Sequence, residues 1–130
     1  KTTRKKLERK DWSRIRANDS WAIFKIMSEF VNGYETMARI GPCVSIFGSA
    51  RTQPNDPYYK LAEKIAYKIS NAGYGVITGG GHGIMEAGNK GAQLGGSASV
   101  GLNIELPHEQ HFNGYIDNDK NLNFDHFLFF

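Results

Sequence analysis

The sequence has 130 residues, of which 40% are hydrophobic and 22% are charged, and its formal net charge is +3. These values describe one ordinary globular domain and exclude a fibrous or an intrinsically disordered chain. There is no apolar run of about eighteen residues, and the basic N-terminus leads to no apolar signal core, so neither a membrane span nor a secretory signal is predicted. We therefore expect a soluble, cytoplasmic protein with no membrane partner. The single Cys43 adjoins an apolar run and is interpreted as an inert, buried thiol.

Positive charge is concentrated in the first 40 residues, which hold ten Lys and Arg against five Asp and Glu, whereas residues 41–130 hold six against eight. Contact with nucleic acid or with a membrane surface is one interpretation of such a segment. Because no aromatic platform or binding motif accompanies the charges, we favour a solvated helix and do not expect nucleic acid as a partner. Residues 1–40 are thus predicted to form a basic helical arm.

The second part of this arm predicts an amphipathic helix. Apolar side chains recur there at positions i, i+4, i+7 and i+11. They are Ile23, Met27, Phe30 and Tyr34, with Phe24 and Val31 beside them. Asp19 or Ser20 would cap the helix. We expect the stripe to pack against the domain or against a partner subunit, and we expect Gly41 and Pro42 to separate the arm from a domain at residues 41–130.

Beyond the arm, strand and helix patterns alternate. The predicted strands lie at residues 43–50, 74–81 and 97–106, and the predicted helices at residues 56–73 and 83–94. The first of these helices carries Tyr58, Leu61, Ile65 and Ile69 at helical spacing and ends at Gly73. Strand, helix and strand in succession form a βαβ unit, and repeated units build a doubly wound parallel sheet. The expected fold is therefore α/β and Rossmann-like, with an N-terminal helical extension.

A cluster of glycines follows the second predicted strand. Gly79, Gly80, Gly81 and Gly83 stand between that strand and the next helix, and Thr78 adds a hydroxyl at the strand end. In parallel sheets, ligands bind beyond the carboxyl ends of the strands, and the first amides of a helix attract anions. This position predicts a phosphate-binding turn, and a purely structural turn is the alternative.

Two well-known phosphate motifs do not match this turn. A dinucleotide fingerprint G-x-G-x-x-G requires a glycine where Glu86 stands, and a P-loop requires Gly-Lys-Ser/Thr where Gly88 is followed by Asn89 and Lys90. NAD binding and a Walker-type NTPase are therefore not supported. His82 within the turn is a candidate phosphate donor, and an exposed loop histidine is the alternative.

Three separated segments carry a family resemblance. They read "VSIFGSAR" at residues 44–51, "GYGVITGGGHGIMEAGNKGA" at residues 73–92 and "GLNIELPHEQHFNGYID" at residues 101–117. Together they resemble the Lonely Guy family of cytokinin riboside 5′-monophosphate phosphoribohydrolases, also described as lysine decarboxylase-like. The resemblance extends over residues 21–130 and is strongest to the longer bacterial members.

The resemblance implies a hydrolase that splits a nucleoside 5′-monophosphate into free base and ribose 5-phosphate, without a cofactor or a metal. The residues that it implies at the substrate, together with Thr78 and His82 from the turn, are Gly48, Ser49, Gly79, Gly80, Gly81, Gly83, Ile84, Met85, Glu86 and Glu109. Short plant-type members have glycine at the position of Glu86, so packing or a subunit contact is the alternative for this residue. His108 and His111 have a spacing found in metal sites, but no third ligand accompanies them.

One part of the family pattern does not occur in the sequence. The motif P-G-G-x-G-T-x-x-E and the arginine-bearing helix before it would follow Phe130, so we expect the catalytic Arg and Glu outside this chain and expect the chain alone to be inactive. Cleavage of the glycosidic bond builds positive charge that a carboxylate must stabilise. The nearest carboxylates are Glu105, Glu109, Asp117 and Asp119, and their spacing nominates none of them as a replacement.

Topology leads to a similar expectation. We expect the crevice of a doubly wound sheet between the first strand and a fourth strand that opens the second half, which leaves the first strand at an exposed edge. The chain therefore reads as the N-terminal half of a nucleotide-binding domain, expected to form a homodimer or a higher homo-oligomer. A non-catalytic nucleotide-binding or signalling module is the alternative function, and an assembly domain that dimerises through its N-terminal helix is a third.

Overall fold

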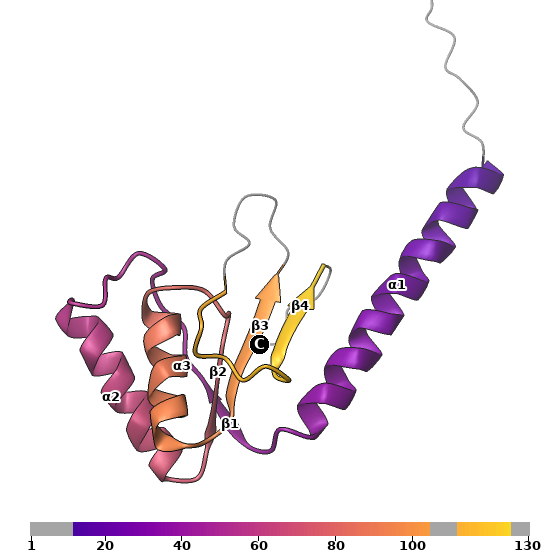
Figure 1. Ribbon diagram of the computed structural model, residues 1–130. Coiled ribbons are helices and arrows are strands. Elements are labelled where there is room, and N and C mark those ends of the chain that lie inside the picture. Colours follow the sequence, from indigo (N-terminus) through magenta and orange to yellow (C-terminus); the bar gives the residue numbers. More distant parts are fainter. Residues whose placement is uncertain (1–11, 105–111, 126–130) are drawn as a thin grey trace, which may run out of the picture.

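The computed structural model describes residues 12–104 and 112–125. Its elements are α1 (Trp12–Ala38), β1 (Cys43–Ser45), α2 (Pro57–Asn71), β2 (Gly75–Thr78), α3 (Ile84–Gly95), β3 (Ser99–Ile104) and β4 (Asn121–Phe124) (Figure 1). The strands form one parallel sheet in the order β1-β2-β3-β4. This arrangement confirms the predicted α/β, Rossmann-like fold and the position of β1 at a sheet edge. Within the described residues, no helix is both long and apolar enough to cross a membrane.

Local sequence signals account for the ends of the two crossover helices. The Asp56 carboxylate accepts a hydrogen bond from the Tyr58 amide at 2.8 Å, and Pro57 occupies the first helical position of α2. Gly73, with a φ of +94°, follows the end of α2. Gly96, with a φ of +80°, caps α3 in the left-handed conformation, which glycine adopts without a steric penalty. The predicted limits of these helices are therefore confirmed to within a few residues.

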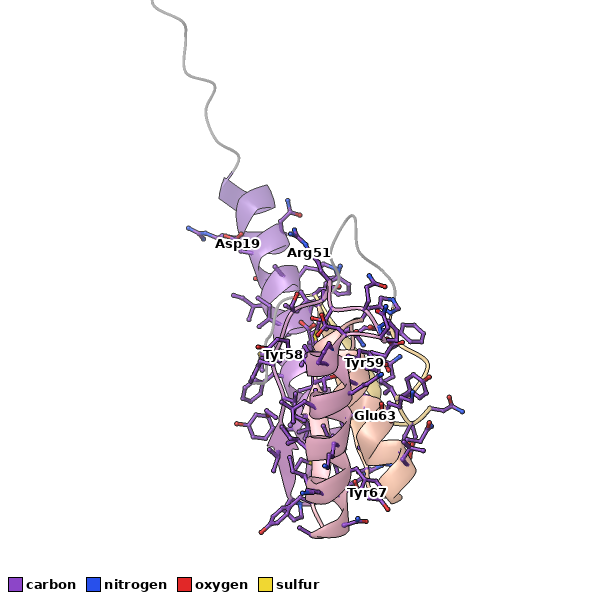
Figure 2. All side chains as sticks on the ribbon, turned by 90° about the vertical axis from the view of Figure 1, so that its left-hand side faces the viewer. Asp19, Arg51, Tyr58, Tyr59, Glu63 and Tyr67 are labelled. Carbon is purple, nitrogen blue, oxygen red and sulfur yellow. The ribbon has the colours of Figure 1, made fainter. Side chains whose placement is uncertain are left out.

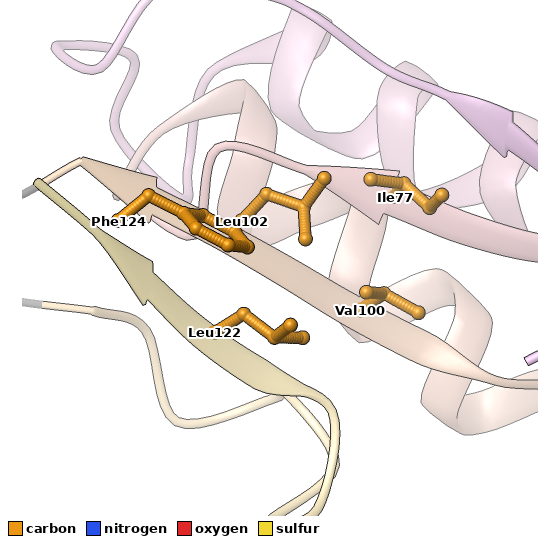
Figure 3. Close-up of a cluster of buried hydrophobic side chains, with 5 residues drawn as sticks. All are labelled: Ile77, Val100, Leu102, Leu122 and Phe124. Atoms are coloured by element: carbon orange, nitrogen blue, oxygen red, sulfur yellow. The ribbon is translucent and has the colours of Figure 1, made fainter. Parts of the chain in front are cut away.

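The sheet has a different covering on each face. Helices α2 and α3 lie together on one face, where Ala66, Val76 and Ala92 form a fully buried cluster (Figure 1). The opposite face carries a larger apolar cluster, to which β2, β3 and β4 all contribute (Figure 3). Its buried members are Ile77, Val100, Leu102, Leu122 and Phe124. Met37 and Ile40, at and just beyond the end of α1, pack against this second cluster, so helical segments contact both faces of the sheet.

The structure adds a strand that the sequence analysis did not predict. Strand β4 pairs with β3, with Leu102 opposite Leu122, and so lies at the far edge from β1. A strand of the second half beside β1, expected outside this chain, stays a prediction. The sequence pattern missed β4 because the strand is only four residues long and its two buried side chains alternate with asparagines, which are uncommon in strands.

The apolar stripe of α1 does not pack against the domain. Its seven large side chains are 43–64% exposed, and Trp21 and Phe24 line an open groove beside Asn123 and Asp125. They are Trp21, Ile23, Phe24, Met27, Phe30, Val31 and Tyr34. The C-terminal end of α1 contacts the apolar cluster of the sheet, and Glu29 in its middle accepts a hydrogen bond from the Asp125 amide, while its N-terminal part reaches away from the sheet (Figure 1). The expectation of packing against the domain is therefore wrong, whereas packing against a partner subunit stays a prediction.

Helix α2 also departs from its apolar pattern. Tyr58 and Leu61 are 72% and 50% exposed, whereas the buried positions of α2 are Tyr59, Ala66 and Ser70. Figure 2 shows Tyr58 and Tyr59 on opposite sides of the helix. Ala66 and Ser70 are small where α3 approaches α2 closely through Gly91 and Gly95, because these approaches leave no space for long side chains.

This close approach predicts that Gly91→Ala destabilises the fold. A Cβ at residue 91 would lie 2.7 Å from Ala66 Cβ and 2.9 Å from the Tyr67 amide nitrogen, so the two helices would have to separate. We expect a loss of about 1–3 kcal/mol in the free energy of unfolding, measured by urea denaturation. Gly114→Ala is the matched control, because a Cβ there meets no atom within 4 Å. Equal stability of the two variants would contradict this packing.

Candidate functional site

The predicted glycine turn lies against the loop that follows β1. Both segments leave the carboxyl ends of neighbouring parallel strands and so meet at one end of the sheet (Figure 1). The amide of Ile84 donates to the Ser49 carbonyl at 3.0 Å. A Cβ on Gly83 would collide with that same carbonyl, and a Cβ on Gly48 would collide with the Ile84 side chain. The structure thus brings the predicted residues Gly48, Ser49, Gly83 and Ile84 into direct contact.

Two glycines of the turn have backbone angles that other residues rarely adopt. Gly80 and Gly83 have φ values of +78° and +70°. A Cβ on Gly80 would also collide with the side-chain amide of Asn103 at the end of β3. Glycine is therefore required here for both the conformation and the close packing of the turn.

The hydroxyl of Thr78 is used inside the protein. Thr78 is fully buried, and its hydroxyl donates to Asn89 Oδ1 at 2.6 Å while accepting from the Gly80 amide at 3.0 Å. The Thr78 hydroxyl therefore stabilises the turn from the protein interior and is not directed at a ligand.

Two buried asparagines outside the predicted set support the turn. Asn89 on α3 and Asn113 on the loop after β3 are 0% and 1% exposed, and Asn113 Nδ2 donates to Asn89 Oδ1 at 3.0 Å. Asn113 also bonds the carbonyls of Gly80 and Gly81. The sequence pattern missed both asparagines because their partners lie on different elements. The one local signal was Asn89, a polar residue on a helix face otherwise formed by glycine and alanine.

The turn presents backbone donors on its outer side. Among the residues that the structure describes, the amides of Gly81 and His82 have no hydrogen-bond acceptor. The His82 side chain is 53% exposed, and Met85 is half-buried in the first turn of α3. The first turn of a helix carries a partial positive charge, so donors and dipole together favour an anion at this position.

Glu86 stands in the first turn of α3, between the glycine turn and α2. Its carboxylate lies 3.9 Å from His82 Nδ1 and close to the Tyr59 phenol on α2. Burial of Tyr59 raises the pKa of its phenol well above the ordinary value, and the nearby negative charge of Glu86 raises it further. The labelled Tyr59 and Glu63 lie along the same side of α2 in Figure 2. Lys90 lies 3.7 Å from Glu63 and above the ring of Tyr59. In the structure, Glu86 therefore connects α3 to α2.

Two of the four carboxylates considered as replacements for the catalytic carboxylate have bonding partners in the structure. Asp117 accepts from the Ser99 amide at 3.1 Å, and both Asp117 and Asp119 pair with Lys120. Glu105 and Glu109 lie outside the described residues, as do His108 and His111. In the ranges 12–104 and 112–125, no three His, Cys, Asp or Glu side chains are grouped so that they could hold a metal ion.

The contact between the turn and the β1 loop predicts unequal effects of two alanine substitutions. Gly83→Ala and Gly96→Ala both place alanine at a positive φ, which costs about 1–2 kcal/mol. Only at Gly83 would the new Cβ also collide with the Ser49 carbonyl, whereas Gly96 faces open space. We expect Gly83→Ala to lose the larger amount of unfolding free energy in urea denaturation. Equal losses would show that the β1 loop does not press against the turn.

A family model and solved structures are similar to parts of this chain. Among curated proteins, none matches the chain. The solved X-ray structure of TM1055 is similar to it with 23% identity and a TM-score of 0.45, over 63% of this chain and 45% of that one. The chain thus spans less than half of TM1055.

The model of the SLOG cluster4 family matches residues 42–119, which is more than half of the chain and includes the β1 loop and the glycine turn. This match confirms the family resemblance carried by the three sequence segments, and it indicates a nucleotide-related function. The chain belongs to the SLOG cluster4 family.

Proposed function

We propose that the glycine turn binds the phosphate of a nucleoside 5′-monophosphate. The observation that carries this proposal is the pair of successive backbone donors at Gly81 and His82, which stand beside the first turn of α3 with no acceptor among the described residues. Successive N–H groups that point to one side form a concave anion site. Gly81 carries no side chain that could block the approach of a phosphate to its own amide.

Two side chains can add to this phosphate site. The exposed imidazole of His82 belongs to the turn itself. The Ser49 hydroxyl oxygen accepts a hydrogen bond from the Arg51 amide at 3.2 Å, which leaves the hydroxyl proton available as a donor. Because Ser49 stands in contact with Gly83, a phosphate on the turn would lie within reach of the β1 loop.

For the full-length protein we propose hydrolysis of the N-glycosidic bond, which yields a free base and ribose 5-phosphate. In this reaction the residues of the present chain hold the phosphate and thereby fix the position of the ribose. The carboxylate that stabilises positive charge on the ribose would come from another part of the site. Glu86 is engaged with Tyr59, and Asp117 with Ser99 and Lys120, so neither is assigned this role.

The same observation favours a second candidate, a nucleotide-binding module without catalysis. Among the described residues, Glu86 and Asp117 are both engaged with other groups, as shown above, and neither is assigned the role of the catalytic carboxylate. Such a module would bind a monophosphate in the same way and would release no base.

Calorimetric titration of the chain with AMP and with adenosine tests phosphate binding. We expect AMP to bind at least about tenfold more tightly, because each hydrogen bond to a charged group contributes about 1.5–3 kcal/mol. Equal affinities, or no binding of either compound, would contradict the proposal. Chromatography of AMP mixtures with the full-length protein then separates the two functions: release of adenine supports hydrolysis, and saturable binding without release supports the module.

A matched pair of glycine variants locates the phosphate. Gly81→Ala places a methyl group beside the flexible end of Met85, at 2.8 Å from its Cε, and requires no positive φ, so we expect the fold to persist. We expect its AMP affinity to fall by about tenfold, because the methyl group narrows the approach to the amides. Gly114→Ala, in open space, is expected to bind as the wild type does. Unchanged affinity of folded Gly81→Ala would place the phosphate elsewhere.

A further inference from the structure

The glycine turn is held from behind by a residue that is distant in sequence. Asn113 follows β3 and is separated from Gly80 by 33 positions, yet it is 1% exposed and its side chain reaches the back of the turn. The backbone amide of Asn113 donates to the Gly80 carbonyl at 2.9 Å, and its side-chain Nδ2 donates to the Gly81 carbonyl at 2.8 Å. Two successive carbonyls of the turn are therefore fixed by one residue.

Fixing these carbonyls also fixes the direction of the amides that follow them. The described peptide bonds are all trans, and in a trans peptide the C=O and the N–H point to opposite sides. Because the carbonyls of Gly80 and Gly81 point toward Asn113, the N–H groups of Gly81 and His82 point away from it. These are the two donors that the phosphate would use.

The orientation of the Asn113 side chain is itself determined by its surroundings. Its Oδ1 accepts from the Tyr115 amide at 3.0 Å, which turns Nδ2 toward the turn, and Nδ2 also donates to Asn89 Oδ1 at 3.0 Å. Asn89 is anchored in turn by donating to Ser99 Oγ at 3.0 Å and to the Val100 carbonyl at 3.1 Å. The Asn113 side chain, which holds the turn, is thus connected through Asn89 to α3 and β3.

We propose that Asn113 is a positioning residue that aims the amides of Gly81 and His82 at the phosphate, an inference that rests on the proposed function. Asn113 does not touch the ligand. It acts by holding two flexible glycine peptides in the one orientation that presents both donors together, so that binding does not have to order them. Without the Asn113 side chain, the peptide between Gly81 and His82 regains the rotational freedom that glycine allows.

The test compares amide resonances of the wild type and of Asn113→Ala during titration with inorganic phosphate. In the wild type, we expect phosphate to shift the amide proton signals of Gly81 and His82 downfield. Asn113→Ala keeps the backbone bond to the Gly80 carbonyl and removes the Nδ2 bond to the Gly81 carbonyl. We therefore expect the His82 shift to be largely lost, the Gly81 shift to be smaller and the phosphate affinity to fall by about tenfold, while signals elsewhere in the sheet persist. A role confined to stability would leave the shifts intact in the folded fraction.

Ser70→Ala is the matched control for loss of a buried hydrogen bond. The Ser70 hydroxyl donates to the Ala92 carbonyl at 3.3 Å and accepts from the Ser97 amide at 3.2 Å, at the contact between α2 and α3, and makes no bond to the turn. We expect this variant to lose stability and to keep the phosphate-induced shifts of Gly81 and His82.

The outcomes separate the two proposals. Absence of shifts in the wild type would overturn phosphate binding itself. Shifts in Asn113→Ala as large as in the wild type would overturn the role of Asn113 and leave phosphate binding standing. If Asn113→Ala does not fold, the titration of the wild type still tests the role of Asn113. An anion at the amides polarises each peptide, including the carbonyl that accepts from Asn113. The Asn113 Nδ2 signals are therefore expected to move with those of Gly81 and His82. Nδ2 signals that stay still while the amides shift would overturn the inference.

Discussion

The candidate site depends on the side-chain amide of Asn89, which is fully buried in the middle of α3. Its oxygen accepts from Thr78 and Asn113, and its nitrogen donates to Ser99 and to the Val100 carbonyl. One side chain thereby connects the end of β2, the start of β3, the helix between them and the loop after β3. A buried amide left without partners costs about 1–3 kcal/mol per group, so this network favours the single arrangement in which all its members are satisfied.

The second constraint is the close approach of backbone segments to one another, which glycine allows. Along α3, Gly91 allows α2 to pack at the distance of a backbone contact, and at the start of the helix Gly83 allows the β1 loop to reach the turn. The two contacts hold α3 between α2 and the loop. The first turn of α3 is consequently in a defined position beside the donors of Gly81 and His82, which is the condition for an anion site that exists before the anion binds.

Local patterns in the sequence predicted those features of the fold and of the site that depend on residues close together in the chain. Asp56 and Gly73 mark the ends of α2, and the glycine cluster places the turn after β2, all as observed. Contacts between distant segments were missed, since Asn113 lies 33 positions from Gly80 and no periodicity connects the two. The alternatives for the stripe of α1 stayed open for a related reason: periodicity identifies an apolar face but not what covers it, and Phe24 in that stripe is 62% exposed in this chain.

A crystal structure of the chain soaked with AMP would show directly whether the glycine turn is a phosphate site. We expect phosphate density within hydrogen-bond distance of the Gly81 and His82 amides, on the side of the turn opposite Asn113, with the β1 loop alongside. AMP bound at another surface, or a turn without density at a concentration that saturates binding in solution, would contradict it.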